Sequence, residues 1–227
     1  MSDSRARILS SIRQSLQTAH LPSPPAVDLP APLDERPASA LAEQFAAELR
    51  ALSGTFLTAA AVDLPDLVAR LTRERGSERL LAWEPEQLPA PGLVAALRQA
   101  GLRVANGAVP AGPERTTTLA EWETITVGLT GADAAIAETG TLVLLAGAGR
   151  PRLAAMSVRR HIVLITPAQL FPTLAAWQAS RPDLARELRA RSAALLVTDP
   201  SRTADIEMTL TVGVHGPGEL IVVLVTA

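Results

Sequence analysis

The chain has 227 residues, 48% of them hydrophobic and 19% charged, a composition that predicts one folded domain with an extension, or two small domains, and not overall disorder. The sequence has no cysteine, lysine or tyrosine, which excludes disulfides, cysteine-ligated metals, thiol nucleophiles and Schiff-base lysines. A formal net charge of −2 and an aromatic content of 3% argue against a nucleic-acid binder, which usually carries clustered positive charge and stacking aromatics.

Residues 4–19 predict a short amphipathic helix, because apolar side chains recur there at helical spacing. They are Ile8, Leu9, Ile12 and Leu16. Six prolines follow between residues 21 and 37, and since proline fixes φ and lacks an amide donor, this stretch is expected to be an extended arm. We therefore predict an N-terminal helix and proline-rich arm over 1–37, which could clasp a partner, and an α/β domain over 38–227.

Helices and strands are expected to alternate from residue 38 onward. The predicted helices cover 38–52, 63–75 (capped by Asp63) and 91–100, and the predicted strands cover 55–60, 79–82 and 102–105. Short apolar strands between helices are typical of a parallel sheet.

The second half of the chain has more strands. They are predicted at 124–129, 134–137, 141–145, 161–165 and 194–198, with helices at 167–177 and 183–191, and a closing strand pair at 209–214 and 219–225. The expected fold class is α/β, with a mixed, mostly parallel sheet and helices on both faces.

No apolar run approaches the roughly 20 residues that a membrane-spanning helix needs. The polar start of the chain, Met1 to Arg5, is not followed by the apolar segment of a secretory signal. We expect no membrane span and a cytoplasmic location.

The first candidate motif is the turn Glu138-Thr139-Gly140 between two short predicted strands. In one interpretation it is a hairpin turn in which Gly140 supplies a positive φ and Glu138 is solvated. In the other, Glu138 lies at a strand end, where it could accept hydrogen bonds from a ligand, act as a base or attack an acyl group. Asp133, a few residues earlier, is expected to cap a local turn.

The second motif is Ser201-Arg202-Thr203, which follows a predicted strand and a proline. Backbone amides at a helix start, together with an arginine, predict an anion site, and an ordinary capped turn is the alternative. Asp205 and Glu207 follow two residues apart. On a strand they would share a face, as a carboxylate pair for acid–base chemistry requires.

The third motif places His215 between Gly213 and Gly216. Histidine titrates near neutrality and glycine permits close approach, so this segment predicts either a proton-transfer site or a tight hairpin with an incidental histidine. His161 starts an apolar strand and is expected to be a satisfied core or edge residue.

No metal site is predicted, because the histidines have neither HxH nor HExxH spacing. Residues 147–152 contain two glycines and two arginines but not a complete dinucleotide-binding fingerprint, so they are expected to form a mobile loop.

Three segments together resemble the LUD-domain family. They are 131–141, 201–207 and 213–220, in the family's order. The resemblance implies a fold similar to ribose-5-phosphate isomerase, glucosamine-6-phosphate deaminase and CoA transferases (the NagB/RpiA/CoA transferase-like fold). It also implies a part in oxidising L-lactate to pyruvate beside two partners expected to hold iron–sulfur clusters.

A chain without cysteine cannot hold those clusters, so the expectation is a non-redox subunit with no cofactor of its own and with iron–sulfur partner proteins. Its site would use Glu138, His215 and Asp205 for proton transfer. The ligand-binding residues would be Arg202, Thr203, Ser201, Thr139, Gly140 and Glu207. The alternative is a stand-alone binder, isomerase or transferase for a phosphorylated sugar or CoA-type anion.

Overall fold

The computed structural model describes residues 2–19, 36–203, 211–213 and 215–226. It divides the chain into two units, residues 1–30 and 31–227. In the first unit, α1 (Ser2–Thr18) is the predicted amphipathic helix, and the side chains of its apolar residues Ile8, Ile12 and Leu16 are exposed. Most of the predicted proline-rich arm lies outside the described residues.

The second unit contains a six-stranded sheet in which every neighbouring pair is parallel. Its strand order is β1 (Thr55–Ala60), β12 (Glu219–Thr226), β7 (Arg160–Ile165), β4 (Val127–Gly131), β2 (Arg79–Ala82) and β3 (Arg103–Ala105). The prediction that the last strand closes a hairpin was wrong, since it lies in the sheet interior between β1 and β7. Its nearly continuous apolar sequence fits this position, because a parallel strand with helices on both sides is buried on both faces.

A second sheet of four strands accompanies the first. Its order is β8 (Leu170–Phe171), β5 (Ala134–Ile136), β6 (Thr141–Ala146) and β9 (Ala193–Val197), with β6 antiparallel to both β5 and β9. Leu142 and Leu144 of β6 belong to the main hydrophobic core, whereas Val143 and Leu145 pack in a smaller core with Trp177. This alternation shows that β6 is buried on both of its faces.

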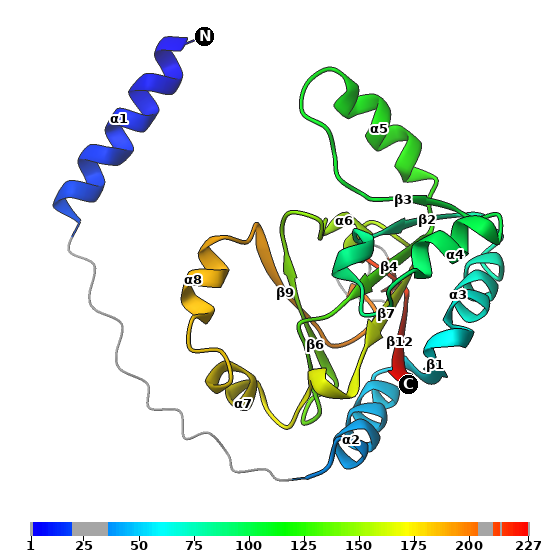
Figure 1. Cartoon of the computed structure of the whole chain (residues 1–227). Coiled ribbons are helices and arrows are strands. Elements are labelled where there is room, and N and C mark those ends of the chain that lie inside the picture. Colours follow the sequence, from blue (N-terminus) through cyan, green and yellow to red (C-terminus); the bar gives the residue numbers. More distant parts are fainter. Residues whose placement is uncertain (1, 20–35, 204–210, 214, 227) are drawn as a thin grey trace. The chain divides into compact units, whose positions relative to one another are not determined.

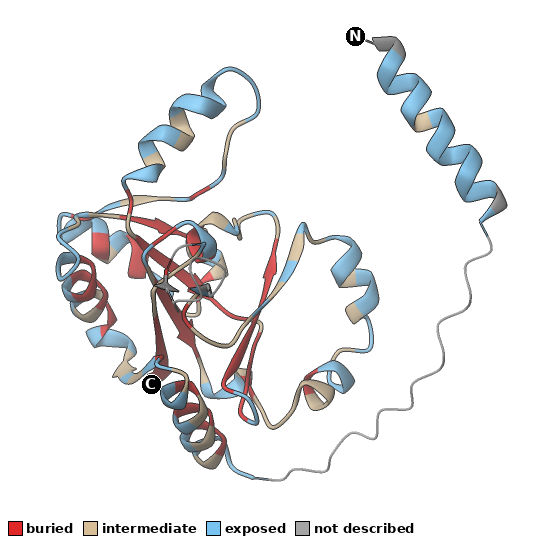
Figure 2. Ribbon diagram, turned by 180° about the vertical axis from the view of Figure 1, so that it is seen from behind, coloured by how far each residue is buried: buried red, intermediate tan, exposed pale blue. Residues whose placement is uncertain are grey.

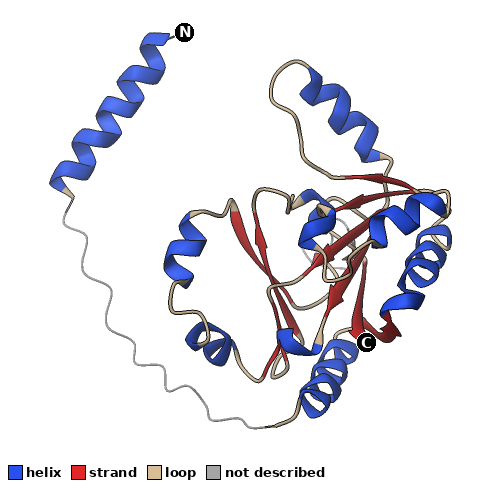
Figure 3. Cartoon of the chain, viewed as in Figure 1, coloured by secondary structure: helices blue, strands red, loops and turns tan. Residues whose placement is uncertain are grey.

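Helices cover both sides of this arrangement (Figures 1 and 3). They are α2 (Ala38–Ala51), α3 (Leu64–Arg73), α4 (Leu93–Gln99), α5 (Glu114–Glu123), α6 (Leu153–Met156), α7 (Leu174–Ala179) and α8 (Leu184–Arg189). Figures 1 and 3 show α3 and α4 on one side and α7 and α8 beyond the four-stranded sheet on the other. The expected mixed α/β fold with a mostly parallel sheet is therefore confirmed, although its strands are divided between two sheets.

In the described part of the chain, the remaining elements are short 3-10 turns and one two-stranded ladder. The 3-10 turns are η1 (Ala61–Asp63), η2 (Pro85–Gln87) and η3 (Pro167–Gln169), and β10 (Arg202–Thr203) pairs with β11 (Thr211–Val212) as a two-stranded antiparallel ladder. The predicted helix over 167–177 was wrong, because η3 is followed by β8 and only then by α7. A capping box between Thr166 and Gln169 stabilises the start of η3, and Thr173 caps α7 with its side chain.

One other local prediction failed, and one helix was missed. The helix after Asp63 begins where expected, but the side chain of Asp63 makes no capping hydrogen bond. The helix α5 was not predicted, because it has no buried residue and therefore no apolar face in its sequence. Figure 2 shows its exposure beside the buried strands of the central sheet.

Gly128 of β4 fixes the position of α6. A Cβ atom at this residue would lie 1.8 Å from the carbonyl oxygen of Ala154, which no side chain could tolerate. The absence of a side chain lets α6 lie directly against the sheet. This close packing defines one wall of the cavity described next.

Candidate functional site

A cavity of about 330 Å³ lies between α6, the edge strand β9 and the segment that precedes β12. It is lined by residues 155, 156, 161, 194–199, 201, 215–217 and 220. Its volume falls within the range of small-molecule sites, roughly 300–1,000 Å³. Because His161 and Leu220 are the second residues of two parallel strands, the cavity lies at the amino ends of β7 and β12.

The second and third sequence motifs meet at this cavity. The amide of Ser201 donates to the carbonyl of Pro217 over 2.8 Å, and the amide of Gly213 donates to the carbonyl of Ser201 over 2.8 Å. Ser201 and the exposed His215 both line the cavity. Two residues that the sequence singled out separately therefore belong to one wall.

The first motif is linked to the same cavity by a chain of hydroxyl groups. Thr139 Oγ1 donates to Thr141 Oγ1 over 2.7 Å, and Thr141 Oγ1 lies 3.0 Å from Thr198 Oγ1. Thr198 lines the cavity and Thr139 is exposed in the turn. The hydroxyls thus form a continuous polar connection between the cavity wall and the turn that contains Glu138.

Glu138 and Gly140 do not themselves line the cavity. Glu138 is exposed, and among the described residues no side chain pairs with its carboxylate. Gly140 has φ 64°, and a Cβ there would lie 2.8 Å from the amide nitrogen of Leu49 in α2. The positive φ and the close approach to α2 give Gly140 a structural reason to be glycine.

Arg202 is directed toward the end of α2. Its Nη2 donates to the carbonyl of Leu52 over 2.7 Å and to Ser53 Oγ over 3.1 Å, and its Nε lies 3.6 Å from the carboxylate of Asp199. A guanidinium at a helix C-terminus is stabilised by the carbonyls left unpaired there. Thr203 is the second residue of β10, and Asp205 and Glu207 lie outside the described residues.

His161 is a member of this site that sequence reasoning assigned to the core. It is fully buried, and its Nε2 lies 2.8 Å from the hydroxyl of Thr130. Burial lowers the pKa of His161 to about 3, because a charged imidazolium would lose its hydration there. Its burial was predicted correctly, but it is not fully satisfied, since its Nδ1 has no hydrogen-bond partner among the described residues. The sequence signal that could have identified His161 as a site residue was a histidine within an otherwise apolar strand.

The opposite end of the sheet, at the carboxyl ends of β2 and β4, carries an ionic cluster. Asp133 Oδ1 accepts from Arg150 over 2.8 Å, and Asp133 Oδ2 accepts from the amide of Leu145 over 2.7 Å. Arg150 also donates to Gln87 over 2.7 Å and lies over the ring of Trp83. The expectation that Asp133 caps a local turn was therefore wrong, because its carboxylate joins segments 12 and 17 residues away. The 147–152 segment was predicted to be a mobile loop, but its first arginine, Arg150, is firmly held.

A groove of about 420 Å³ lies beside this cluster. It is lined by residues 107–109, 115, 119, 147–149, 151–153 and 192. Its two cationic side chains, Arg115 and Arg152, are both exposed. Open α/β sheets often bind ligands at the carboxyl ends of their strands, so this groove is a second candidate for an anionic ligand.

Among the described residues, no cluster of three or more histidine, aspartate or glutamate side chains has the arrangement of a metal site. Within the same residues, every helix is too short or too polar to cross a lipid bilayer.

The chain is similar to several bacterial proteins named lactate utilization protein C. The protein from a Geobacillus species is 28% identical over 171 residues, which cover 73% of this chain and 70% of that protein. The protein from an Exiguobacterium species is 39% identical over 100 residues, which are 44% of each chain. The Bacillus subtilis protein is 34% identical over 107 residues, or 46% of this chain and 44% of that protein. The matched regions thus span less than half the length of the last two relatives.

A crystal structure of a DUF162 family protein from Deinococcus radiodurans has the same fold. Its TM-score is 0.59 at 23% sequence identity, and the match covers 84% of this chain and 99% of that one. The LUD domain family model matches residues 42–225, which contain the cavity, the ionic cluster and both sheets. This match confirms the family resemblance of the sequence motifs, and the protein belongs to the LUD domain family.

Proposed function

We propose that this chain is a non-redox subunit of a cytoplasmic L-lactate utilization system. The observation that carries the proposal is its similarity to proteins named lactate utilization protein C, together with the family match over most of the chain. The reaction is the oxidation of L-lactate to pyruvate, which releases two protons and two electrons. The chain has no cysteine, so it cannot hold an iron–sulfur cluster through thiolate ligands. In this proposal the electrons therefore pass to clusters held by partner proteins.

In this proposal the chain contributes substrate binding and proton transfer. The base that takes the hydroxyl proton must lie within reach of the bound substrate. His215, an exposed residue of the cavity lining, supports this role, and the threonine hydroxyls connect the cavity to the turn that contains Glu138. Ser201 and Thr198 supply hydroxyl donors on the same wall.

A second candidate function is the binding of a phosphorylated sugar or a CoA-type anion. The groove at the carboxyl ends of the strands favours it, because Arg115 and Arg152 offer two exposed guanidinium groups to an anion there. In a thermal-shift panel on the isolated protein, stabilisation by ribose 5-phosphate or CoA would favour this function. The same ligands should then fail to stabilise the double variant Arg115→Ala, Arg152→Ala.

Complementation tests the lactate proposal directly. A Bacillus subtilis strain deleted for its own lactate utilization protein C would express this chain and be grown with L-lactate as the carbon source. We expect growth to be restored relative to an empty vector, with both strains growing equally on glucose. If the chain is produced and folded but a lactate-grown culture stays at the empty-vector level, the proposed function is wrong for this chain in that host's system. Pull-down of the tagged chain from lactate-grown cells then checks for iron–sulfur partners by their absorption.

A further inference from the structure

One side chain in the wall of the cavity at the amino ends of β7 and β12 has a buried polar atom without a hydrogen-bond partner among the described residues. Four buried side-chain atoms of the described residues have no hydrogen-bond partner, and they belong to Trp83, Thr126, His161 and Trp177. Of these residues, His161 lines the cavity. Leaving a buried polar group unpaired is unfavourable, so an unpaired atom on a cavity-lining side chain suggests a ligand that completes the hydrogen bond.

The neighbouring threonine determines which type of partner Nδ1 requires. Thr130 is fully buried, and His161 Nε2 is the only hydrogen-bond partner of its hydroxyl among the described residues. If Nε2 carried the proton, the hydroxyl hydrogen of Thr130 would have no acceptor. The arrangement that satisfies both groups has Thr130 donating to a bare Nε2, which places the imidazole proton on Nδ1. His161 therefore presents a neutral N–H donor.

The rest of the cavity defines the ligand further. Ala155, Leu195 and Leu220 provide an apolar wall, and Thr198, Ser201 and His215 provide a polar one. We propose that the cavity binds a small molecule with a carbonyl or carboxylate oxygen, and that Nδ1–H of His161 donates to this oxygen and positions it. The inference rests on the cavity and the unpaired atom, so it does not depend on the lactate proposal.

Three probes of one shape test the proposed preference for an acceptor. Cyclohexanecarboxylate and cyclohexyl methyl ketone both carry an acceptor oxygen, whereas cyclohexylmethylammonium carries the same ring with donors only. The chain has three histidines, so a long-range ¹H–¹⁵N spectrum of the labelled protein contains three ring systems. The His161→Phe variant assigns one of them, and its amide spectrum reports whether it folds.

We expect His161 at pH 7 to be protonated on Nδ1 and bare on Nε2. Both acceptor probes should shift the Nδ1 signal, and the ammonium probe should not. The carboxylate should bind the wild type about tenfold more tightly than the His161→Phe variant, since a charge-assisted hydrogen bond is lost.

Three outcomes would overturn the inference: a proton on Nε2, an unchanged His161 signal with both acceptor probes, or an equal shift with the ammonium probe. If His161→Phe does not fold, the tautomer and the probe-induced shifts in the wild type decide the question alone, with His161 assigned by its Thr130→Val shift.

Discussion

Buried polar side chains at the two ends of the six-stranded sheet differ in whether the protein supplies all of their hydrogen-bond partners. At the carboxyl ends of β2 and β4, Asp133 and Arg150 pair with each other, and each has a further partner. At the amino ends of β7 and β12, the fully buried His161 has a partner at Nε2 and, among the described residues, none at Nδ1. Charge is abundant at the first end, but its buried charges are satisfied by the protein itself.

This difference separates two roles that look alike in a sequence. A paired carboxylate and guanidinium joining distant segments hold the fold together, because breaking the pair leaves a buried charge. An unpaired neutral donor in a cavity adds nothing to the stability of the empty protein, so its position requires another explanation. The predictions below test whether the ionic cluster serves stability and the cavity serves binding.

The largest expected effect is on stability, from Asp133→Ala. This carboxylate is only 5% exposed and pairs with Arg150, and Arg181 lies 3.9 Å away. Its loss should lower the free energy of unfolding by roughly 3 kcal/mol or more, measured by urea denaturation. The matched control is the exposed Asp183, whose side chain makes no capping hydrogen bond to α8. The unfolding free energy of Asp183→Ala should stay within about 0.5 kcal/mol of the wild type. Equal stabilities of the two variants would contradict a structural role for the cluster.

Lowering the pH should destabilise the protein through His161. Its pKa is about 3 when folded, against an ordinary value of 6.5, so between these pH values the unfolded chain binds a proton that the folded chain does not. This contribution is complete above pH 6.5 and is lost as the pH falls, at most about 1.4 kcal/mol per pH unit. At pH 4.5 the loss should reach about 3 kcal/mol relative to pH 7.5. Subtracting the pH dependence of the His161→Phe variant isolates it, and parallel curves would show that His161 is not buried as a neutral ring.

Thr130→Val should have an intermediate effect. It removes the hydroxyl that pairs with His161 Nε2 while keeping the shape of the side chain. The unpaired nitrogen should cost about 1–3 kcal/mol in thermal or urea unfolding. Thr58→Val, at an exposed position of β1, is the control. A Thr130→Val protein as stable as the control would remove the argument for the Nδ1–H tautomer.

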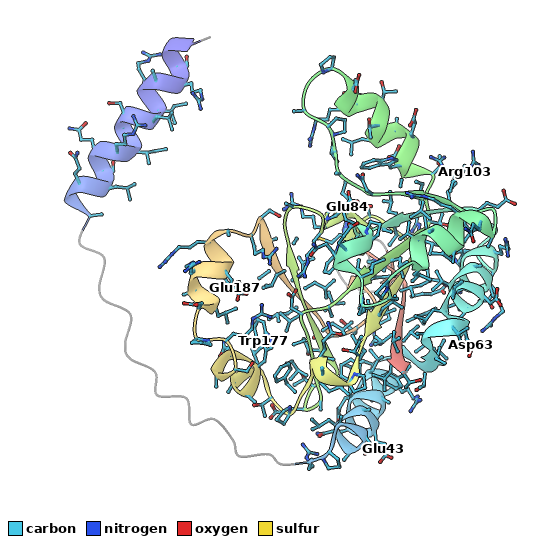
Figure 4. All side chains as sticks on the ribbon, viewed as in Figure 1. Glu43, Asp63, Glu84, Arg103, Trp177 and Glu187 are labelled. Atoms are coloured by element: carbon cyan, nitrogen blue, oxygen red, sulfur yellow. The ribbon has the colours of Figure 1, made fainter. Side chains whose placement is uncertain are left out.

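The smallest effect is expected for Glu187→Gln. Glu187 pairs with Arg181 over 2.6 Å, but the two side chains are 34% and 27% exposed. Figure 4 labels Glu187 and the nearby Trp177, which Arg181 also contacts. A partly exposed pair contributes little, so the unfolding free energy should change by less than about 1 kcal/mol. A larger loss would extend the ionic cluster at Asp133 to the α7–α8 region.

Local sequence signals were enough for much of the fold. The strands Thr55–Ala60 and Arg79–Ala82 have their predicted bounds. Gly76, just after α3, has the positive φ expected of a helix C-terminus. These features depend on neighbours in the chain. The position of β12 inside the sheet, between β1 and β7, depends on pairing with strands about 60 and 165 residues away in the chain. The periodicity of apolar residues does not encode such long-range pairing.

The same limit applies to the candidate site. Ser201 and His215 were identified by residue type, and the structure places both on one cavity wall. The contact of Arg202 with Leu52 spans 150 positions in the chain, so its guanidinium looked free in the sequence. His161 was assigned to the core because its strand is apolar, and only the three-dimensional arrangement reveals that Nδ1 has no partner.

Blocking the cavity is the most direct test of the account. Ala194 is an exposed residue of β9 at the cavity, and Ala190 is an exposed residue just after α8 that does not line it. Each would be replaced by tryptophan and expressed in the Bacillus subtilis strain that lacks its own lactate utilization protein C. With the wild-type chain restoring growth on L-lactate, the account predicts that Ala190→Trp also restores it and that Ala194→Trp does not, although both proteins fold. Growth of the Ala194→Trp strain at the wild-type rate would contradict the claim that this cavity is the functional site.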